Sequence, residues 1–162
     1  MQEMELLGVR VEMPANAPMV LLRERDGAGR TVPIFIGAPE ATAIAMAIDG
    51  VETPRPMTHD LVRDLLETMG VEVDRVVVTS LQDKTFFADL HLIQDGQSTV
   101  LSCRPSDAIA IAVRTGSTIF ASDSVITEAG YLEDAESDDE PEEMVEEFKE
   151  FLDTISPEDF ED

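Results

Sequence analysis

The sequence has little of several features that would narrow its class at once. It holds one cysteine, one tyrosine, two histidines and no tryptophan among 162 residues. A single cysteine excludes a disulfide within the chain, and no apolar run reaches the roughly 20 residues that a membrane-spanning helix needs. The N-terminus shows no basic segment followed by an apolar one. We therefore expect a cytoplasmic protein without disulfides and with no membrane contact.

Positive charge is scarce as well. Eleven Lys and Arg stand against 35 Asp and Glu, and the net charge is −24. Residues 1–130 hold 19 acidic and 10 basic side chains, whereas residues 131–162 hold 16 acidic and one basic. Nucleic-acid-binding proteins usually carry a basic face, because phosphate contacts supply much of their affinity. Composition by itself gives no indication of such a face.

The uneven charge divides the chain into two units. Residues 1–130 are long enough for one domain, and 43% of the whole chain is apolar, enough for a packed core. Residues 131–162 form an acidic tail, in which 134–143 is predicted to be disordered or loosely held. An apolar stripe at helical spacing follows and predicts an amphipathic helix that binds this domain or another protein. The stripe consists of Met144, Phe148, Phe151, Leu152 and Ile155.

Apolar periodicity and turn clusters predict the elements of the domain. Strands are expected over residues 5–13, 19–25, 31–36, 71–81, 86–93, up to 101, and 118–121. Helices are expected over residues 41–48, from Thr58 to Gly70, over 105–115, and after a cap at Ser122 or Asp123. The predicted fold class is α/β (α+β-like), a single domain with a mixed β-sheet and packed Ala-rich helices.

Residues 102–116 carry the most informative pattern. A strand ends in a turn at Pro105, which suits the first turn of a helix because its missing N–H would be unpaired there. Either Arg104 or Ser106 is the N-cap, Asp107 falls in the first turn, and Gly116 ends the helix. The helix body is Ala, Ile and Val, which predicts a covered helix.

Residues 31–50 repeat this pattern. A strand leads through Gly37 and Pro39 into a second Ala-rich helix, and alignment of the two stretches matches Glu40 with Asp107. One explanation is that two buried Ala/Ile helices simply look alike. The other is a pseudo-duplicated strand-turn-helix unit that presents two carboxylates at corresponding helix starts.

Three segments resemble the bifunctional nuclease domain family: residues 33–41, 55–61 and 104–110. Their order makes the match more specific than one short motif, and the likeness covers roughly residues 5–130. It implies DNase and RNase activity and an α/β fold that pairs into a wedge-shaped homodimer, with a groove as the proposed active site. The tail resembles the acidic extension of bacterial members. Where the family pattern commonly has Asp, this chain has Ser102, which would weaken metal binding if that carboxylate is a ligand.

Phosphodiester cleavage needs an activated water or ribose hydroxyl, stabilisation of the developing charge and help for the leaving oxygen. Three acids at predicted helix starts, Glu40, Asp60 and Asp107, are candidate catalytic residues. The same three are candidate ligands for a divalent metal ion, Mg²⁺ or Mn²⁺. His59 is the candidate for proton transfer, because histidine titrates near neutral pH.

Arg55 and Arg104 are the candidate substrate-binding residues, because a planar guanidinium fits phosphate oxygens. Each candidate also has a structural interpretation: the acids stabilise helix N-termini, the arginines pair with those acids, and His59 extends a cap. His91 alternates with strand residues and is predicted to be a surface or packing residue. Cys103 has no accompanying signature of a nucleophile.

Two functional hypotheses follow. The first is a nuclease that hydrolyses phosphodiester bonds of DNA and RNA with the help of a metal ion, and that forms a homodimer. The second is a non-catalytic interaction or regulatory module, in which the acidic tail and the apolar stripe bind a protein partner.

Overall fold

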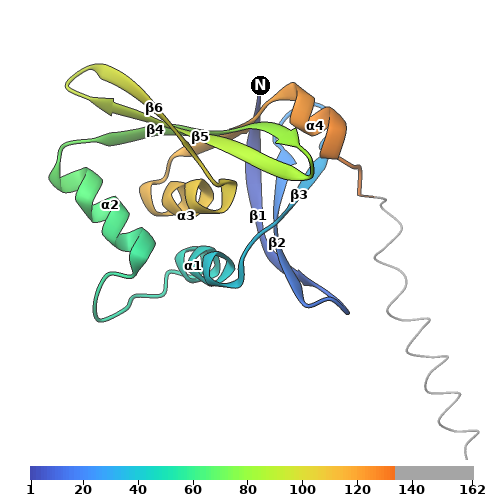
Figure 1. Cartoon of the computed structure of the whole chain (residues 1–162), viewed down its shortest axis with the longest axis horizontal. Helices are drawn as coiled ribbons and strands as arrows, with labels where there is room; N and C mark the ends of the chain where they lie inside the picture. Colours follow the sequence, from blue (N-terminus) through green and yellow to red (C-terminus); the bar gives the residue numbers. More distant parts are fainter. Residues whose placement is uncertain (134–162) are drawn as a thin grey trace, which may run out of the picture. The chain divides into compact units, whose positions relative to one another are not determined.

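The computed structural model describes residues 1–133, and the strands among them form one mixed sheet of seven in the order β3-β2-β1-β7-β4-β5-β6 (Figure 1). The strands are β1 (Gln2–Glu12), β2 (Ala17–Glu24), β3 (Thr31–Phe35), β4 (Glu72–Gln82), β5 (Thr85–Gln94), β6 (Gln97–Cys103) and β7 (Thr118–Ala121). The helices are α1 (Ala38–Ile48), α2 (Thr58–Thr68), α3 (Pro105–Thr115) and α4 (Asp123–Ala129). The predicted α/β fold with a mixed sheet is confirmed.

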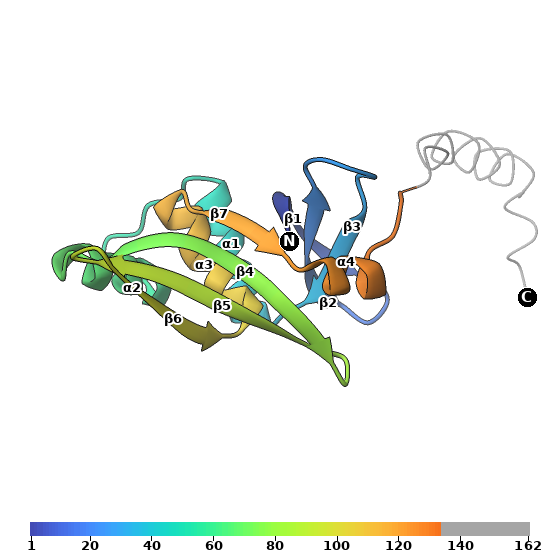
Figure 2. The same ribbon diagram turned by 90° about the horizontal axis from the view of Figure 1, so that it is seen from above.

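The sheet is arranged in the same way on both sides of β7. On one side β1, β2 and β3 form an antiparallel meander that leads into α1. On the other side β4, β5 and β6 form a second meander that leads into α3. The short β7 pairs antiparallel with β1 and parallel with β4, and so joins the two halves (Figure 2). The two similar strand-turn-helix stretches therefore occupy corresponding places in the topology.

Although their preceding strands lie at opposite edges of the sheet, α1 and α3 pack against each other (Figure 1). The second helix, α2, packs against α3 as well. Residues 108–112 of α3 are buried, as the run of Ala and Ile predicted. Alanine on a packed helix lets neighbouring backbones approach closely, which brings the N-terminal ends of these helices together.

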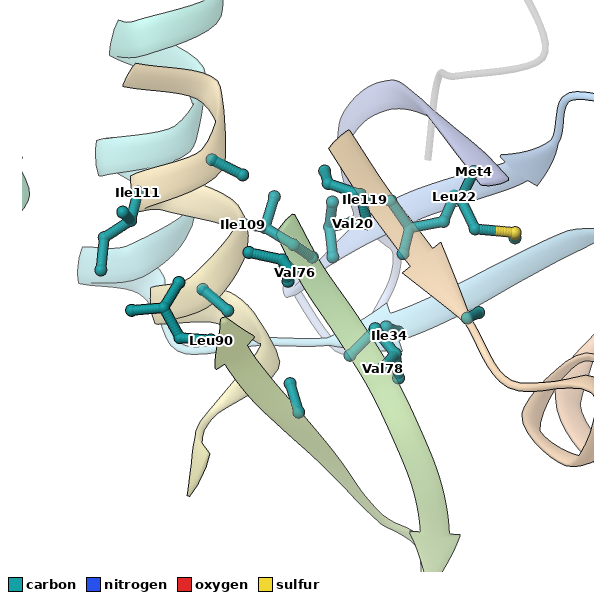
Figure 3. Packing of buried hydrophobic residues seen from close by; sticks show 14 of the residues in the cluster. Met4, Val20, Leu22, Ile34, Val76, Val78, Leu90, Ile109, Ile111 and Ile119 are labelled. Atoms are coloured by element: carbon teal, nitrogen blue, oxygen red, sulfur yellow. The ribbon is translucent and has the colours of Figure 1, made fainter. Parts of the chain in front are cut away.

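The core lies between the sheet and α3. Ile109 extends from the helix toward Val76 of β4, and side chains of the first meander fill the space beside them (Figure 3). Val20 and Leu22 of β2 are fully buried there. Because the cluster draws on both halves of the sheet, each half needs the other to cover its apolar face.

Helix starts differ from the sequence-based expectation at two places. The first helix begins at Ala38 and not at residue 41, because Pro39 fits a first turn. Thr58 was expected to cap α2, which was wrong: Met57 is the N-cap, and its backbone N–H donates to the Asp60 carboxylate at 3.0 Å. Of the two candidates for α4, Ser122 is the cap, since its hydroxyl accepts from the N–H of Val125.

The compact unit extends from Met1 to Leu132. Tyr131 pairs with Thr31 of β3 through two backbone hydrogen bonds of 2.7 and 3.0 Å, so the chain stays tied to the sheet beyond α4. The predicted loose acidic segment and the apolar stripe lie outside the described residues. Within residues 1–133, none of the helices has the length and apolar character needed to span a bilayer.

Candidate active site

A cavity of about 250 Å³ lies where α1, α2 and α3 begin. Its lining comes from the first turns of these three helices, from later residues of α1, from the loop before α2 and from Arg114 in the last turn of α3. The polar lining residues include Glu40, His59, Asp60, Arg104, Asp107 and Arg114. Of the six residues predicted for the site, five therefore line one cavity, and only Arg55 does not.

The sequence leaves the starts of α1 and α3 without side-chain caps. The N-cap positions are Gly37, which has no side chain, and Arg104, whose guanidinium cannot accept a hydrogen bond from the helix. A proline in each first turn removes one unpaired N–H, and the remaining ones contribute to the positive end of the helix dipole. Helix N-termini of this kind favour anionic groups.

Asp107 is the centre of the polar network. Its Oδ1 lies 2.9 Å from Nε2 of His59, and its Oδ2 accepts a 2.8 Å hydrogen bond from Nε of Arg104. Arg104 also donates from Nη2 to Oε1 of Glu40 at 3.0 Å. One chain of contacts, Glu40–Arg104–Asp107–His59, thus joins the starts of all three helices.

The contact with Asp107 defines the state of His59. A carboxylate only accepts hydrogen bonds, so we assign the proton of the neutral ring to Nε2, and Nδ1 keeps a lone pair. The His59 side chain is 12% exposed, which limits its other orientations. Partial burial would raise the pKa of Asp107, but the hydrogen bonds from Arg104 and His59 hold the pKa of this carboxyl below its ordinary value.

Arg104 is the most accessible charged group of the network. Its side chain is 65% exposed, whereas that of Glu40 is 15% exposed. The Glu40 carboxylate folds back toward Gly37, and a Cβ on residue 37 would overlap it. Glycine at this position therefore lets Glu40 reach Arg104 while the guanidinium faces solvent.

Asp60 belongs to a second network, which is more deeply buried. Arg114 of α3 donates from Nε to Oδ1 of Asp60 at 2.7 Å, and its other nitrogens donate to the carbonyl oxygens of Ala110 and Ala43. The hydrogen bond from Arg114 is the main reason that the pKa of Asp60 is lowered. The other oxygen of Asp60 accepts from the Met57 N–H at the start of α2. Asp60 therefore ties α2 to α3 through Arg114, and Arg114 in turn bonds to α1 at Ala43.

Sequence reasoning did not assign Arg114 this role. The signal was present, because Arg114 is the one charged residue in the last turn of a helix whose body, residues 108–113, is only Ala, Ile and Val. A charge on such a helix needs a buried partner, and Asp60 is that partner. The Arg114 side chain is only 6% exposed, and that of Asp60 is 22% exposed.

The other residues singled out from the sequence lie outside the cavity. Arg55 is in the exposed connection before α2, and Ser102 is in the edge strand β6, opposite Asp89. His91 lies within β5. Burial, with the nearby charges of Asp107 and Asp89, raises the pKa of the Cys103 thiol to about 11, so the thiol stays protonated near neutral pH.

The predicted metal ligands do not fit a metal centre as they are arranged. Among residues 1–133, no three or more His, Cys, Asp or Glu side chains are grouped as ligands for one ion. Glu40 and Asp107 share the guanidinium of Arg104, and both oxygens of Asp60 already accept hydrogen bonds. A divalent ion bound by these carboxylates would compete with the arginines that already pair with them, so we derive no chemical step through it. The Mg²⁺ or Mn²⁺ requirement stays a prediction.

The fold and the cavity define an α/β domain with a candidate acid–base pair beside an exposed arginine. Comparison with known proteins identifies its family: the model of the bifunctional nuclease domain matches residues 20–134. The chain belongs to this family, as the three motifs indicated.

Individual relatives agree with this assignment. An uncharacterized protein of Mycobacterium tuberculosis is 48% identical over 99% of this chain and 98% of its own length. Bifunctional nuclease 2 of Arabidopsis thaliana is 35% identical over 63% of this chain and 32% of its own length. Bifunctional nuclease 1 of the same plant is 34% identical over 62% of this chain and 32% of its own length. The similarity to the plant nucleases is therefore confined to one part of those longer proteins.

Proposed function

We propose that the protein is a nuclease that hydrolyses phosphodiester bonds of DNA and RNA. The observation that carries the proposal is the contact between His59 and Asp107 beside the exposed guanidinium of Arg104, in the lining of one cavity. The names of the plant relatives and the family assignment support the choice of substrate.

In this proposal His59 acts as the general base. Its Nδ1 lone pair takes a proton from a water molecule as the water oxygen attacks phosphorus, and the imidazolium that forms is stabilised by Asp107. The bond from phosphorus to the leaving oxygen then breaks, and the protonated ring can return its proton to that oxygen. Because water is the nucleophile, the same route serves DNA, which lacks a 2′-hydroxyl.

Arg104 holds the phosphate in this proposal. Its guanidinium is exposed and oriented by two carboxylates, and it can donate to the non-bridging oxygens whose charge grows in the transition state. The uncapped N-termini of α1 and α3 add favourable potential at the same place. These contributions matter because Glu40 and Asp107 otherwise make the cavity unfavourable for an anion.

A purified-protein assay tests the function and the metal prediction together. Labelled single-stranded DNA, duplex DNA and RNA are incubated with the full chain in EDTA and in a titration of Mg²⁺ or Mn²⁺. Cleavage by the wild-type chain that is lost in the His59→Ala chain supports the proposal. Cleavage in EDTA would contradict the metal requirement, and no cleavage under any condition would contradict the nuclease function and favour the non-catalytic interaction module.

We also propose a homodimer built on α2. Four apolar side chains at intervals of four residues lie along one face of this helix and its flanks, each at least half exposed: Met57, Leu61, Leu65 and Met69. A stripe of this kind is costly to leave in water and is typical of a helix that packs against another surface. The other proposed partner, a protein that binds the C-terminal apolar stripe, involves residues outside the described range.

A further inference from the structure

A second cavity, of about 400 Å³, also has Arg104 in its lining. It is formed by the end of β3, the turn between β4 and β5, and the start of α3. Arg104 lines both cavities, so a ligand that extends from one to the other would pass its guanidinium. Although the chain has 35 acidic residues, none of the described residues that line this second cavity is acidic.

Lys84 brings a second cation to this cavity, and its backbone is unusual. It stands in the two-residue turn that joins β4 and β5 at one end of the sheet (Figure 2), where Asp83 has φ of 48° and Lys84 has φ of 63°. Left-handed conformations at both positions define a turn that favours Gly at the second one. The turn between β5 and β6 has glycine at this position: Asp95 has φ of 50°, and Gly96, which follows it, has φ of 75°.

A lysine therefore occupies a position where glycine would be the more stable residue. The backbone gains nothing from this side chain, which suggests that the ammonium group is needed where the turn places it. Lys84 is the only lysine in residues 1–133.

Phe35 supplies an aromatic surface in the same cavity. It is the last residue of β3, and 58% of it is exposed, which is unusual for a phenylalanine. Phe86 also lines the cavity, but it is half-buried and packs against the core. An exposed aromatic ring beside two cations is the combination that binds single-stranded nucleic acid, since bases stack on the ring and phosphates pair with the cations.

We propose that this cavity is a subsite for single-stranded nucleic acid, in which an unpaired base stacks on Phe35 and its phosphate pairs with Lys84. The strand continues past Arg104 into the cavity that holds His59 and Asp107. The proposal rests on the proposed nuclease function for the identity of the polymer. A paired base cannot present its face to Phe35, so duplex DNA binds this subsite more weakly.

The test measures binding of the full chain to fluorescently labelled oligo-dT of about 12 nucleotides, a length within the range that such sites cover. Every protein carries His59→Ala to prevent cleavage, and binding is followed by fluorescence anisotropy. Phe35→Ala is expected to weaken binding at least about fivefold, the effect of losing one stacked base. The matched control is Phe87→Ala, because Phe87 is 38% exposed and does not line the cavity.

Lys84→Gly separates binding from folding. The variant is expected to have a higher melting temperature than its parent, because glycine suits the turn, and yet to bind oligo-dT more weakly. The slope of log K for oligo-dT binding against log salt concentration should be shallower by about 0.7 for this variant, which is the value for one lost contact with single-stranded phosphate. Arg10→Ala is the control, since it removes an exposed cation of β1 outside this cavity and should leave the slope unchanged.

The outcomes distinguish this proposal from the nuclease function. Equal binding by the Phe35 and Phe87 variants, an unchanged salt slope for Lys84→Gly, or duplex DNA bound as tightly as oligo-dT would each overturn the subsite. If the wild-type chain cleaves nothing but binds oligo-dT through Phe35 and Lys84, the nuclease proposal fails and the subsite stands.

Discussion

Asp107 of α3 holds His59 of α2 through a 2.9 Å contact between Oδ1 and Nε2, across 48 positions of sequence. The other oxygen of the same carboxylate holds Arg104. One side chain therefore orients both the proposed base and the proposed phosphate-binding group, and its loss affects both roles at once.

Asp107→Asn and His59→Ala are expected to abolish nuclease activity while the fold is retained. The first removes the charge that stabilises imidazolium and the second removes the base, and each should lower kcat by about 100-fold or more. Both residues are partly buried at helix starts and act there as a dipole partner or an extension of a cap, so the free energy of unfolding should fall by only about 0.5–2 kcal/mol. Kinetic assays and urea titration measure the two effects.

The control is Asp89→Asn, which changes a half-buried acid of β5 outside the cavity. Wild-type activity in both site variants would remove His59 and Asp107 from the mechanism. Gross unfolding of both would favour the structural interpretation, in which these residues only complete helix ends.

Asp60→Asn is expected to lower the free energy of unfolding more than Asp107→Asn does. The change leaves the guanidinium of Arg114, whose side chain is 6% exposed, without its charged partner. Breaking such a pair costs about 3 kcal/mol. Asp64→Asn is the matched control on α2, because Asp64 pairs with the adjacent and accessible Arg63 and should cost under about 1 kcal/mol. Equal losses in the two variants by urea titration would contradict the structural role of Asp60.

The same pair predicts a dependence of stability on pH. The folded-state pKa of Asp60 lies below its ordinary value of 3.8, so the folded state binds a proton less readily than the unfolded state does. The stabilisation is complete above pH values near 3.8 and disappears as the pH falls through the folded-state pKa. Unfolding measured from pH 6 to 2 should therefore show a shallower acid slope for Asp60→Asn than for wild type, and an identical slope would contradict the assignment.

Much of the fold could be predicted because it rests on local signals. Pro105 and Gly116 define the limits of α3, and alternating apolar residues define the strands. The helix starts were harder to predict. Met57 is the N-cap of α2, and its backbone N–H donates to Asp60, whereas the neighbouring Thr58 is the residue type that usually caps a helix. A side chain with a high capping propensity is not always the one the chain uses.

Most residues of the candidate site could be predicted from the sequence, but the pairs that its acids and arginines form could not. The sequence placed Glu40, Asp60 and Asp107 at helix starts, and the packing of α1, α2 and α3 brings them to one cavity. Asp60 pairs with Arg114 across 54 positions of sequence, and Glu40 pairs with Arg104 across 64. Such pairs depend on how the helices pack, which local sequence patterns do not encode. The second cavity was missed for the same reason, since Phe35 and Lys84 come from different halves of the sheet.

Leu65→Lys is expected to convert the proposed homodimer to a monomer. The change puts a charge in the middle of the exposed apolar stripe of α2, where a partner surface would have to desolvate it. Glu67→Lys is the control, because it places the same side chain on the same helix but off the stripe. Light scattering at micromolar concentration measures the mass. A wild-type chain that gives only the monomer mass would contradict the dimer.

Removal of the acidic tail is expected to strengthen nucleic-acid binding. Residues 134–162 hold 15 acidic and one basic side chain, and this charge repels phosphate within about 8–10 Å at ordinary salt. The cut belongs after Glu133 and not after Gly130, because Tyr131 pairs with Thr31. We expect about three- to tenfold tighter binding of oligo-dT at low salt, with a gain that shrinks as the salt concentration rises.

A full-length variant in which the acidic residues of 134–143 are changed to their amides serves as the control. It keeps the length of the tail and removes much of its charge, so it should reproduce most of the gain if the effect is electrostatic. A gain that does not depend on salt, or one that only truncation produces, would contradict the electrostatic explanation and favour steric blocking by the tail. No gain at any salt concentration would contradict repulsion and leave the tail as a candidate binding segment for a protein partner.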